Sequence, residues 1–600
     1  MKLTRFIPLL AAAALLAPVF FTGGCANTTE APTGGPKDTI PPVIIGINPL
    51  PGAVRCPVSK MRIVFTFNEY VNIKNAQNIF LSPPLEKKPD AKMKGRNLVV
   101  TFPVDLAPNT TYSLSMTDAI ADNNENNPFP GYTYVFSTGD RIDSLFMTGA
   151  VLDCNTLDPV KGATVMLYRD HADSAVFLKR PVAAAKTDQW GYFVLPHIAD
   201  TLYRLYAVRD DNGNNLYDPD TERIAFLDSL VRPVKTMNDS LPELMRYDMT
   251  DTLGCQARAV EHELKLFREK PSKQYLVNKV RTSLRSAYIT FMAPGAWIDS
   301  LWVGGLRPDQ IISQFNVEQD SLEIWLNDRR NAPDTIHLFV NYRKTDSTGV
   351  LRPELEHVTL SIDPALKRTY SKSNRRKLKH EDTTCVFKLT AEPETVEQNG
   401  FSLEFGQPLI SAAFDSLRFR YLNPRQKEFT ADLDVERDSL NLRRYILRPK
   451  VKFQKGYEYF LKVPHRAFRN IDGFWSDSTE VKVMLPADET LSRLDLSFKG
   501  VECRCIVDML DEKRSKVLRS YTLDSDGTLA FPYLKEGRYS VRVAEDRNGN
   551  GIIDTGSVLE HRQSERVVFV KAGGENYISV PKSAELTQEV DLHELFNGQR

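Results

Sequence analysis

Two short loops in this chain of 600 residues place oxygen-bearing side chains at alternate positions. The loop near the carboxyl terminus offers Asp546, Asn548, Asn550 and Asp554, and Gly551 occupies the position that a calcium-binding loop gives to glycine. EF-hand loops use this spacing because calcium prefers several hard oxygen ligands. The position that normally supplies a bidentate carboxylate holds a serine, so the closing acid of such a loop is missing.

An earlier loop repeats the pattern with Asp210, Asn212, Asn214 and Asp218, has Asn215 at the glycine position, and also lacks the closing acid. Two interpretations are open. The oxygens could bind calcium in the range of extracellular modules, about 0.1 to 1 mM. Asparagine and glycine are also the residues of tight turns, because they tolerate positive φ. We favour turns, keep weak calcium binding as the alternative, and expect no other cofactor.

Sequence motifs of catalytic and zinc-binding sites are missing or incomplete in this chain. His262 and Glu263 begin a zinc-protease motif, but Leu266 stands where the second histidine belongs. Cys503 and Cys505 lack a second cysteine pair or a nearby histidine, so we expect no metal there. Their spacing in a predicted strand would put both on one face, which disfavours a disulfide between them. Carboxylates are abundant, so a hydrolase stays open as the least favoured function.

The amino terminus carries the features of an export signal. Residues 1–24 combine a short basic start with an apolar run from Phe6 to Phe21, shorter than the roughly 20 residues that span a membrane. The small residues before Cys25 resemble the lipobox of bacterial lipoproteins, although Thr22 replaces the usual leucine. This resemblance implies that fatty acyl chains such as palmitate anchor Cys25 to a membrane. An ordinary signal peptide with an incidental cysteine is the alternative.

Composition limits the partners and the architecture. Residues 25–38 are rich in Thr, Pro and Gly and predict a flexible tether. The 77 basic and 77 acidic residues give no net charge, which argues against nucleic-acid binding. The chain is long enough for four or five domains of about 100 to 150 residues. The seven cysteines are scattered and do not form a disulfide framework.

Short alternating segments separated by turns predict an all-β protein of tandem β-sandwich modules after the signal peptide. Residues 39–140 contain such a segment at 61–67 and a corner motif that ends at Tyr112, which we interpret as structural. This region resembles the bacterial Ig-like domain of envelope and S-layer proteins. Residues 384–486 repeat parts of it, and we expect a second Ig-like module there.

The region 143–245 resembles a transthyretin-like or carboxypeptidase-regulatory-like sandwich, most specifically in its Thr187-Asp188-x-x-Gly191-x-Phe193 hairpin. The hairpin and the acidic loop recur in residues 488–582, which indicates an internal duplication. The remaining predicted regions are a β module of unclear type at 250–365, a basic linker at 366–383 and a carboxyl-terminal tail at 583–600.

The whole chain resembles the multi-Ig-like lipoproteins of the Bacteroidetes type. This implies a non-catalytic scaffold, spacer or accessory subunit of an outer-membrane assembly, anchored by its lipid and bound to envelope proteins. We expect the periplasmic face, because no acidic cluster follows Cys25. The alternative is a glycan-binding surface lipoprotein, and its candidate residues are Trp297, Trp302, Trp325 and Trp475. The basic stretch 367–380 is either an anion-binding patch or a solvated hinge.

Overall fold

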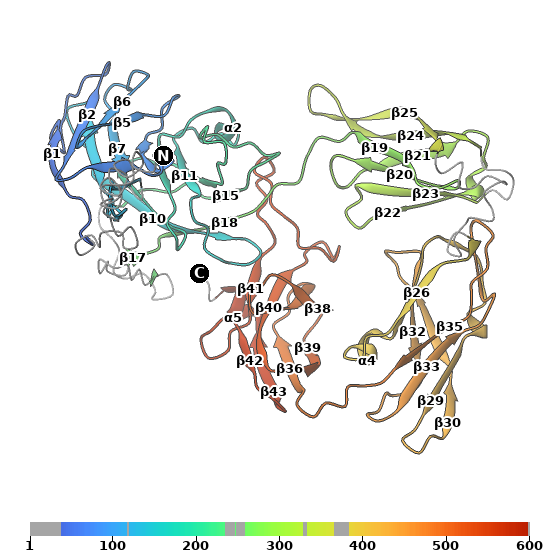
Figure 1. Cartoon of the computed structure of the whole chain (residues 1–600). Helices are drawn as coiled ribbons and strands as arrows, with labels where there is room; N and C mark the ends of the chain where they lie inside the picture. The colour runs from blue at the N-terminus through green and yellow to red at the C-terminus, as the bar shows by residue number, and fades with distance from the viewer. Residues whose placement is uncertain are drawn as a thin grey trace, which may run out of the picture. The chain divides into compact units, whose positions relative to one another are not determined.

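The computed structural model describes residues 38–116, 119–234, 246–247, 258–327, 333–364 and 383–597. These residues form β-strands with a few short helices, which confirms the predicted all-β class of tandem sandwich modules (Figure 1). The chain divides into two compact units, residues 1–144 and 145–600. Within the described residues, no helix has the length and apolar character needed to cross a membrane.

The first unit is one sandwich around a single apolar core. Its alternating segment forms β2 (Arg62–Phe67), where Ile63, Phe65 and Phe67 are fully buried and the residues between them face outward. One sheet has the order β1-β2-β6-β5, with β1 (Ile44–Asn48), β6 (Asn97–Thr101) and β5 (Asp90–Lys94). The others are β4-β7-β9 and β3-β8, with β4 (Phe80–Ser82), β7 (Thr111–Ser115), β9 (Thr133–Ser137), β3 (Val71–Ile73) and β8 (Ile120–Asp122).

The predicted tyrosine corner is confirmed in this unit. Tyr112 is 1% exposed, and its hydroxyl accepts a hydrogen bond from the Ala107 N–H at 2.8 Å. Burial raises the pKa of Tyr112, so the hydroxyl stays protonated at neutral pH. In the Ig-like module predicted at 384–486, Tyr459 accepts the N–H of Gln454, also five positions earlier. The two modules therefore share this corner as well as their sequence pattern.

The second unit begins with a module of two sheets. The sheet β13-β10-β18 contains β13 (Tyr192–Ile198), β10 (Leu145–Asp153) and β18 (His262–Leu266), and β18 runs parallel to β10. The sheet β12-β11-β14-β15 contains β12 (Ala183–Lys186), β11 (Thr164–Tyr168), β14 (Arg204–Val208) and β15 (Ile224–Phe226). The short helix α2 (Ala175–Leu178) follows β11, and a separate pair joins β16 (Arg246–Tyr247) to β17 (Arg258–Ala259).

The carboxyl-terminal module repeats this topology, which confirms the duplication. Its first sheet is β39-β36-β43, with β39 (Gly527–Leu534), β36 (Ser492–Lys499) and β43 (Glu585–Asp591), and β43 runs parallel to β36. Its second sheet is β38-β37-β40-β41, with β38 (Val517–Leu523), β37 (Cys505–Leu510), β40 (Gly537–Glu545) and β41 (Val567–Phe569), and β42 (Ile578–Val580) also pairs with β40. Helix α5 (Leu592–Asn597) follows β43.

In three places the structure differs from the sequence-based expectation. Strand β18 joins the module predicted to end at 245, and β43 lies in the region predicted as a tail. Both strands pair in parallel with the first strand of their module, a contact distant in sequence that local patterns do not reveal. Cys503 precedes β37, which begins at Cys505, so the two cysteines do not share a strand; both are free thiols.

The middle module has the sheets β19-β20-β23-β22 and β21-β24-β25, formed by β19 (Leu276–Arg281), β20 (Ser286–Phe291), β23 (Ser321–Leu326), β22 (Ile311–Phe315), β21 (Ile298–Val303), β24 (Thr335–Thr345) and β25 (Leu351–Ser361). The following module repeats the arrangement of the first unit. Its main sheets are β26-β27-β32-β31 and β30-β29-β33-β35, and β28 pairs with β34. Their bounds are β26 (Phe387–Thr390), β27 (Phe401–Phe405), β28 (Leu409–Ala412), β29 (Arg418–Leu422), β30 (Glu428–Ala431), β31 (Leu433–Arg437), β32 (Arg444–Pro449), β33 (Glu458–Val463), β34 (Phe468–Asn470) and β35 (Thr479–Val483), with α4 (Val396–Asn399) before β27.

Candidate functional site

The two motif loops occupy equivalent places in the duplicated modules. The first Asx loop, residues 210–222, connects β14 to β15. The second Asx loop, residues 546–565, connects β40 to β41. In each module the two connected strands are neighbours in the second sheet, so the loop closes at the end of an antiparallel pair. The duplicated sequence therefore produces duplicated geometry.

In the first Asx loop, the predicted residues come together around two carboxylates. Asp210 accepts hydrogen bonds from the backbone N–H groups of Asn214 at 3.1 Å and Asn215 at 3.0 Å. The side-chain amides of Asn212 and Asn214 donate to Oδ2 of Asp218 at 2.6 and 3.0 Å. The amide oxygen of Asn212 in turn accepts the Asn214 N–H at 2.8 Å. The loop is thus closed by its own side chains.

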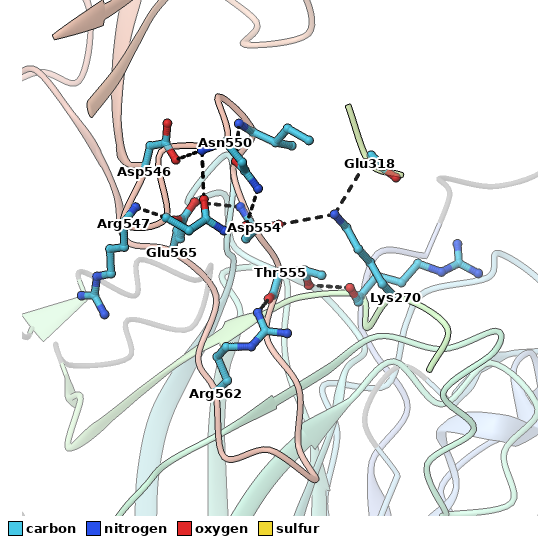
Figure 2. Close-up of polar contacts among 12 residues, drawn as sticks. Lys270, Glu318, Asp546, Arg547, Asn550, Asp554, Thr555, Arg562 and Glu565 are labelled. Carbon is cyan, nitrogen blue, oxygen red and sulfur yellow. Dashed lines mark hydrogen bonds and ion pairs between the residues drawn. The ribbon is translucent and has the colours of Figure 1, made fainter. Parts of the chain in front are cut away.

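The second Asx loop repeats these bonds, and Figure 2 shows how its Asn550 lies between Asp546 and Asp554. Asp546, 1% exposed, accepts the N–H groups of Asn550 at 3.0 Å and Gly551 at 2.9 Å. The amides of Asn548 and Asn550 donate to Oδ2 of Asp554 at 2.6 and 2.8 Å. The four predicted residues of each loop therefore belong to one hydrogen-bonded frame.

A glutamate that the sequence patterns did not reveal completes each frame. Glu222 is 1% exposed and Glu565 is 9% exposed, and each accepts two backbone hydrogen bonds across its loop. The donors are the N–H groups of Asp211 (3.2 Å) and Asp218 (3.1 Å) for Glu222, and those of Arg547 (2.8 Å) and Asp554 (2.8 Å) for Glu565. Glu222 lies one position beyond the place where an EF-hand acid is expected. A motif search that allowed a shift of one residue would have found it. Glu565 lies farther along the chain from Asp546 than any calcium-loop motif would place its closing acid.

Burial and neighbouring charge act on these two glutamates. Burial is the main cause that raises the pKa of Glu222, and the carboxylates of Asp210 and Asp218 raise it further. Burial likewise raises the pKa of Glu565, with additional repulsion from the aspartates of its loop. The backbone donors oppose this rise, because hydrogen bonds favour the charged carboxylate.

The arrangement of donors favours the turn interpretation. Backbone N–H groups donate to both carboxylate oxygens of Asp210 and Asp546, and asparagine amides donate to Oδ2 of Asp218 and Asp554, so these oxygens are already engaged as acceptors. Across the described parts of the chain, no group of three or more His, Cys, Asp or Glu side chains is placed to hold a metal ion. The frame fixes the path of the backbone, as Asx turns do, and calcium binding by these loops stays an untested prediction.

Beyond its frame, the second Asx loop contacts the first module of the same unit. Residues 555–563, the docking segment, follow Asp554 and reach the segment after β18. Thr555, labelled in Figure 2, donates to the carbonyl of Arg268. The Val558 N–H donates to Glu269 at 2.7 Å. Lys270 lies 3.4 Å from Asp554 and 3.6 Å from Glu318 of the middle module. The docking segment therefore links modules distant in sequence.

An apolar contact accompanies these polar ones. Val558 is 1% exposed and lies in a buried cluster whose other members, including Val176, Tyr217 and Phe267, all come from the first module of the unit. Gly556 passes so close that an added Cβ would lie 2.6 Å from the Phe267 ring. Only glycine permits this approach without displacing the ring. The docking segment thus fills a site in another module's core.

The four tryptophans predicted as a glycan platform differ in their exposure to solvent. Trp297 is 67% exposed and Trp302 39%, whereas Trp325 is 3% exposed and packs under the Arg443 guanidinium. Trp475 is 38% exposed. Of the four, Trp325 cannot serve as a glycan platform. Cys25, the signal peptide 1–24 and the basic stretch 367–380 lie outside the described residues.

Comparison with known proteins identifies the fold of one module. Residues 38–138 match a family model described as a bacterial Ig-like domain. A search of curated proteins found no match. A crystal structure of the S-layer protein rSbsC aligns at 8% identity over 75% of this chain and 67% of that chain, with a TM-score of 0.16. The major pilin subunit BcpA of Bacillus cereus aligns at 11% identity over 75% of this chain and 99% of that chain, with a TM-score of 0.13. The first module is therefore similar to bacterial Ig-like domains, within an all-β chain of tandem sandwich modules.

Proposed function

We propose that this chain is a non-catalytic lipoprotein of the cell envelope that serves as a scaffold, spacer or accessory subunit in an outer-membrane assembly. The proposal rests chiefly on the docking segment, because it joins the last module to the first module of the second unit through buried contacts. A spacer needs such contacts, since linkers alone leave modules free to reorient.

Further contacts between successive modules support the same role. Arg443 lies 2.9 Å from Glu323 of the middle module and stacks on Trp325, so this ion pair is partly shielded from water. Tyr533 of the last module donates to Glu397 of the preceding one at 3.1 Å. These contacts restrain neighbouring modules against each other, as a scaffold or spacer requires.

Resemblances in the sequence support the location of this scaffold. A lipobox-like Cys25 would tether the modules to a membrane through acyl chains, as in multi-Ig-like lipoproteins of the Bacteroidetes type. The duplicated modules would be transthyretin-like units of that scaffold. The lack of an acidic cluster after Cys25 favours the periplasmic face of the outer membrane. Partners would be other envelope proteins that contact the modules.

Membrane fractionation and affinity purification test this proposal together. We expect Cys25→Ser to move the chain from the membrane fraction to the soluble fraction, and we expect the tagged wild type to co-purify with envelope proteins from detergent-solubilised membranes. Cys56→Ser is the matched control, because this cysteine belongs to the Ig-like core. Membrane retention of Cys25→Ser, or hydrolytic turnover by the purified soluble part, would contradict the proposal.

Glycan binding is the second candidate, and the exposure of Trp297 favours it. This side chain is 67% exposed beside β21, and Trp302 on β21 stacks on Phe339 with ring centroids 5.2 Å apart. Exposed aromatic rings bind sugar faces. A glycan array that is silent for the wild type would reject this candidate, whereas binding lost in Trp297→Ala would support it.

A further inference from the structure

A polar cavity of about 580 Å³ lies in the first module of the second unit, beside the first Asx loop. Its volume falls within the range of small-molecule sites, about 300 to 1,000 Å³. Four cationic side chains and three carboxylates line it, and the cations are Lys161, Arg209, Arg223 and Arg268. We propose that this cavity binds a saccharide that carries a carboxylate group. This proposal does not depend on the scaffold role.

The cations retain donors that can face a ligand. Arg223 donates through Nη1 to Asp153 at 2.8 Å, and Arg268 donates through Nη2 to the Asp220 carbonyl at 3.2 Å. Each guanidinium has five N–H donors, so these bonds leave several unused. The Lys161 side chain is exposed at the cavity. An arginine fork and a nearby ammonium are suited to a carboxylate, because charge-assisted hydrogen bonds are strong and directional.

The acidic side chains of the cavity narrow the ligand class. Asp158 and Asp211 have side chains 57% and 67% exposed, so their oxygens are accessible. Carboxylates accept hydrogen bonds from hydroxyl groups but repel a densely charged polyanion. A lining with both signs of charge therefore suits a molecule with one acid group and several hydroxyls. A uronic-acid sugar has this chemistry, whereas inorganic phosphate uses only the cations.

The last module holds one wall of the cavity. Arg514 donates to the Thr156 carbonyl at 2.8 Å and lies 3.4 Å from Asp158, and both of these residues line the cavity. Leu157 between them packs against a buried cluster of the last module, as Ile553 of the second Asx loop also does. The wall is thus positioned by contacts across the module boundary. Saccharide binding should therefore weaken when those contacts are removed.

Isothermal titration of the detergent-purified full chain tests the proposal. The probes are an acidic trimer of one galacturonic acid and two galactose units, a neutral galactose trimer and inorganic phosphate. We expect the acidic trimer to bind, the neutral trimer not to bind, and phosphate to bind at least about tenfold more weakly than the acidic trimer. Lys161→Glu should weaken binding of the acidic trimer by about tenfold or more, because it replaces attraction by repulsion. Arg514→Ala should also weaken it.

Arg180→Glu is the matched control, since Arg180 is exposed in the same module and does not line the cavity. We expect it to bind the acidic trimer as the wild type does. Absence of binding by the acidic trimer, equal binding by the neutral trimer or by phosphate, or unchanged binding in Lys161→Glu would each overturn the proposal. Circular dichroism of each variant establishes that it is folded before titration.

Discussion

The two Asx loops share one hydrogen-bonded frame but differ in the length of chain between its aspartates and its closing glutamate. In the first loop, Glu222 comes four positions after Asp218. In the second, Glu565 comes eleven positions after Asp554, and the additional residues form the docking segment. Only the second loop sends a buried side chain, Val558, into the core of another module.

This contrast shows how a turn can acquire a new role. Asp546 and Glu565 fix both ends of the second loop through backbone hydrogen bonds, so residues inserted between them leave a rigid base. A long surface insertion costs little free energy when its ends are already held together. The frame therefore allows one copy of the duplication to bind a neighbouring module while the other copy remains a simple turn.

The two loops differ in docking, and removing the apolar contact of Val558 should have the largest effect on the docking of the second loop. We expect Val558→Asp to destabilise the docked state by about 3 to 5 kcal/mol, because it buries a charge without a partner. Hydrogen exchange should then rise in residues 555–563 and around Phe267. Val517→Asp is the control, since Val517 is 45% exposed on the same module. Unchanged exchange in Val558→Asp would show that the contact does not hold the modules together.

Removing the closing glutamates tests the shared frame. We expect Glu222→Ala and Glu565→Ala each to lower the free energy of unfolding of their module by about 1 to 3 kcal/mol, because backbone N–H groups lose their acceptors. Only Glu565→Ala should also increase exchange in the docking segment. Glu560→Ala, at a side chain 67% exposed, is the control for chemical denaturation. Equal effects of both substitutions on the docking segment would refute the proposed division of roles.

The pH dependence of stability gives a smaller effect. The raised pKa of Glu222 means that the folded state holds this proton more tightly than the unfolded state, whose carboxyl titrates near 4.5. The contribution of Glu222 to the free energy of unfolding is therefore fully present below pH 4.5, and it is lost as the pH rises through the pKa that this side chain has in the folded state. We expect the stability of the wild type relative to Glu222→Gln to decrease from pH 4.5 toward neutrality in urea titrations. A relative stability that rises with pH would contradict the direction of this shift.

Local sequence patterns predicted much of this fold, and the exceptions have a physical cause. Strand β2, the Tyr112 corner and the duplicated loops depend on neighbours within a few residues, so spacing revealed them. Strands β18 and β43 depend on parallel pairing with strands far away in sequence. Glu565 and the docking segment likewise act through contacts that no spacing rule encodes. The predicted oxygens of each loop do assemble, but they assemble around backbone donors.

Calcium should have the smallest effect, and it tests whether the two loops are turns or metal sites. The carboxylate oxygens of both loops accept internal hydrogen bonds, so we expect neither EDTA nor about 1 mM calcium to change the Tm. This calcium concentration matches the dissociation constants of extracellular calcium-binding modules. Differential scanning calorimetry of the wild type, Asp210→Ala and Asp546→Ala measures this. A calcium-dependent rise in the wild type that disappears in one variant would establish a metal site in that loop. The loops would then differ in ligand as well as in docking, since calcium must displace the asparagine amides from Asp218 or Asp554 before it can bind.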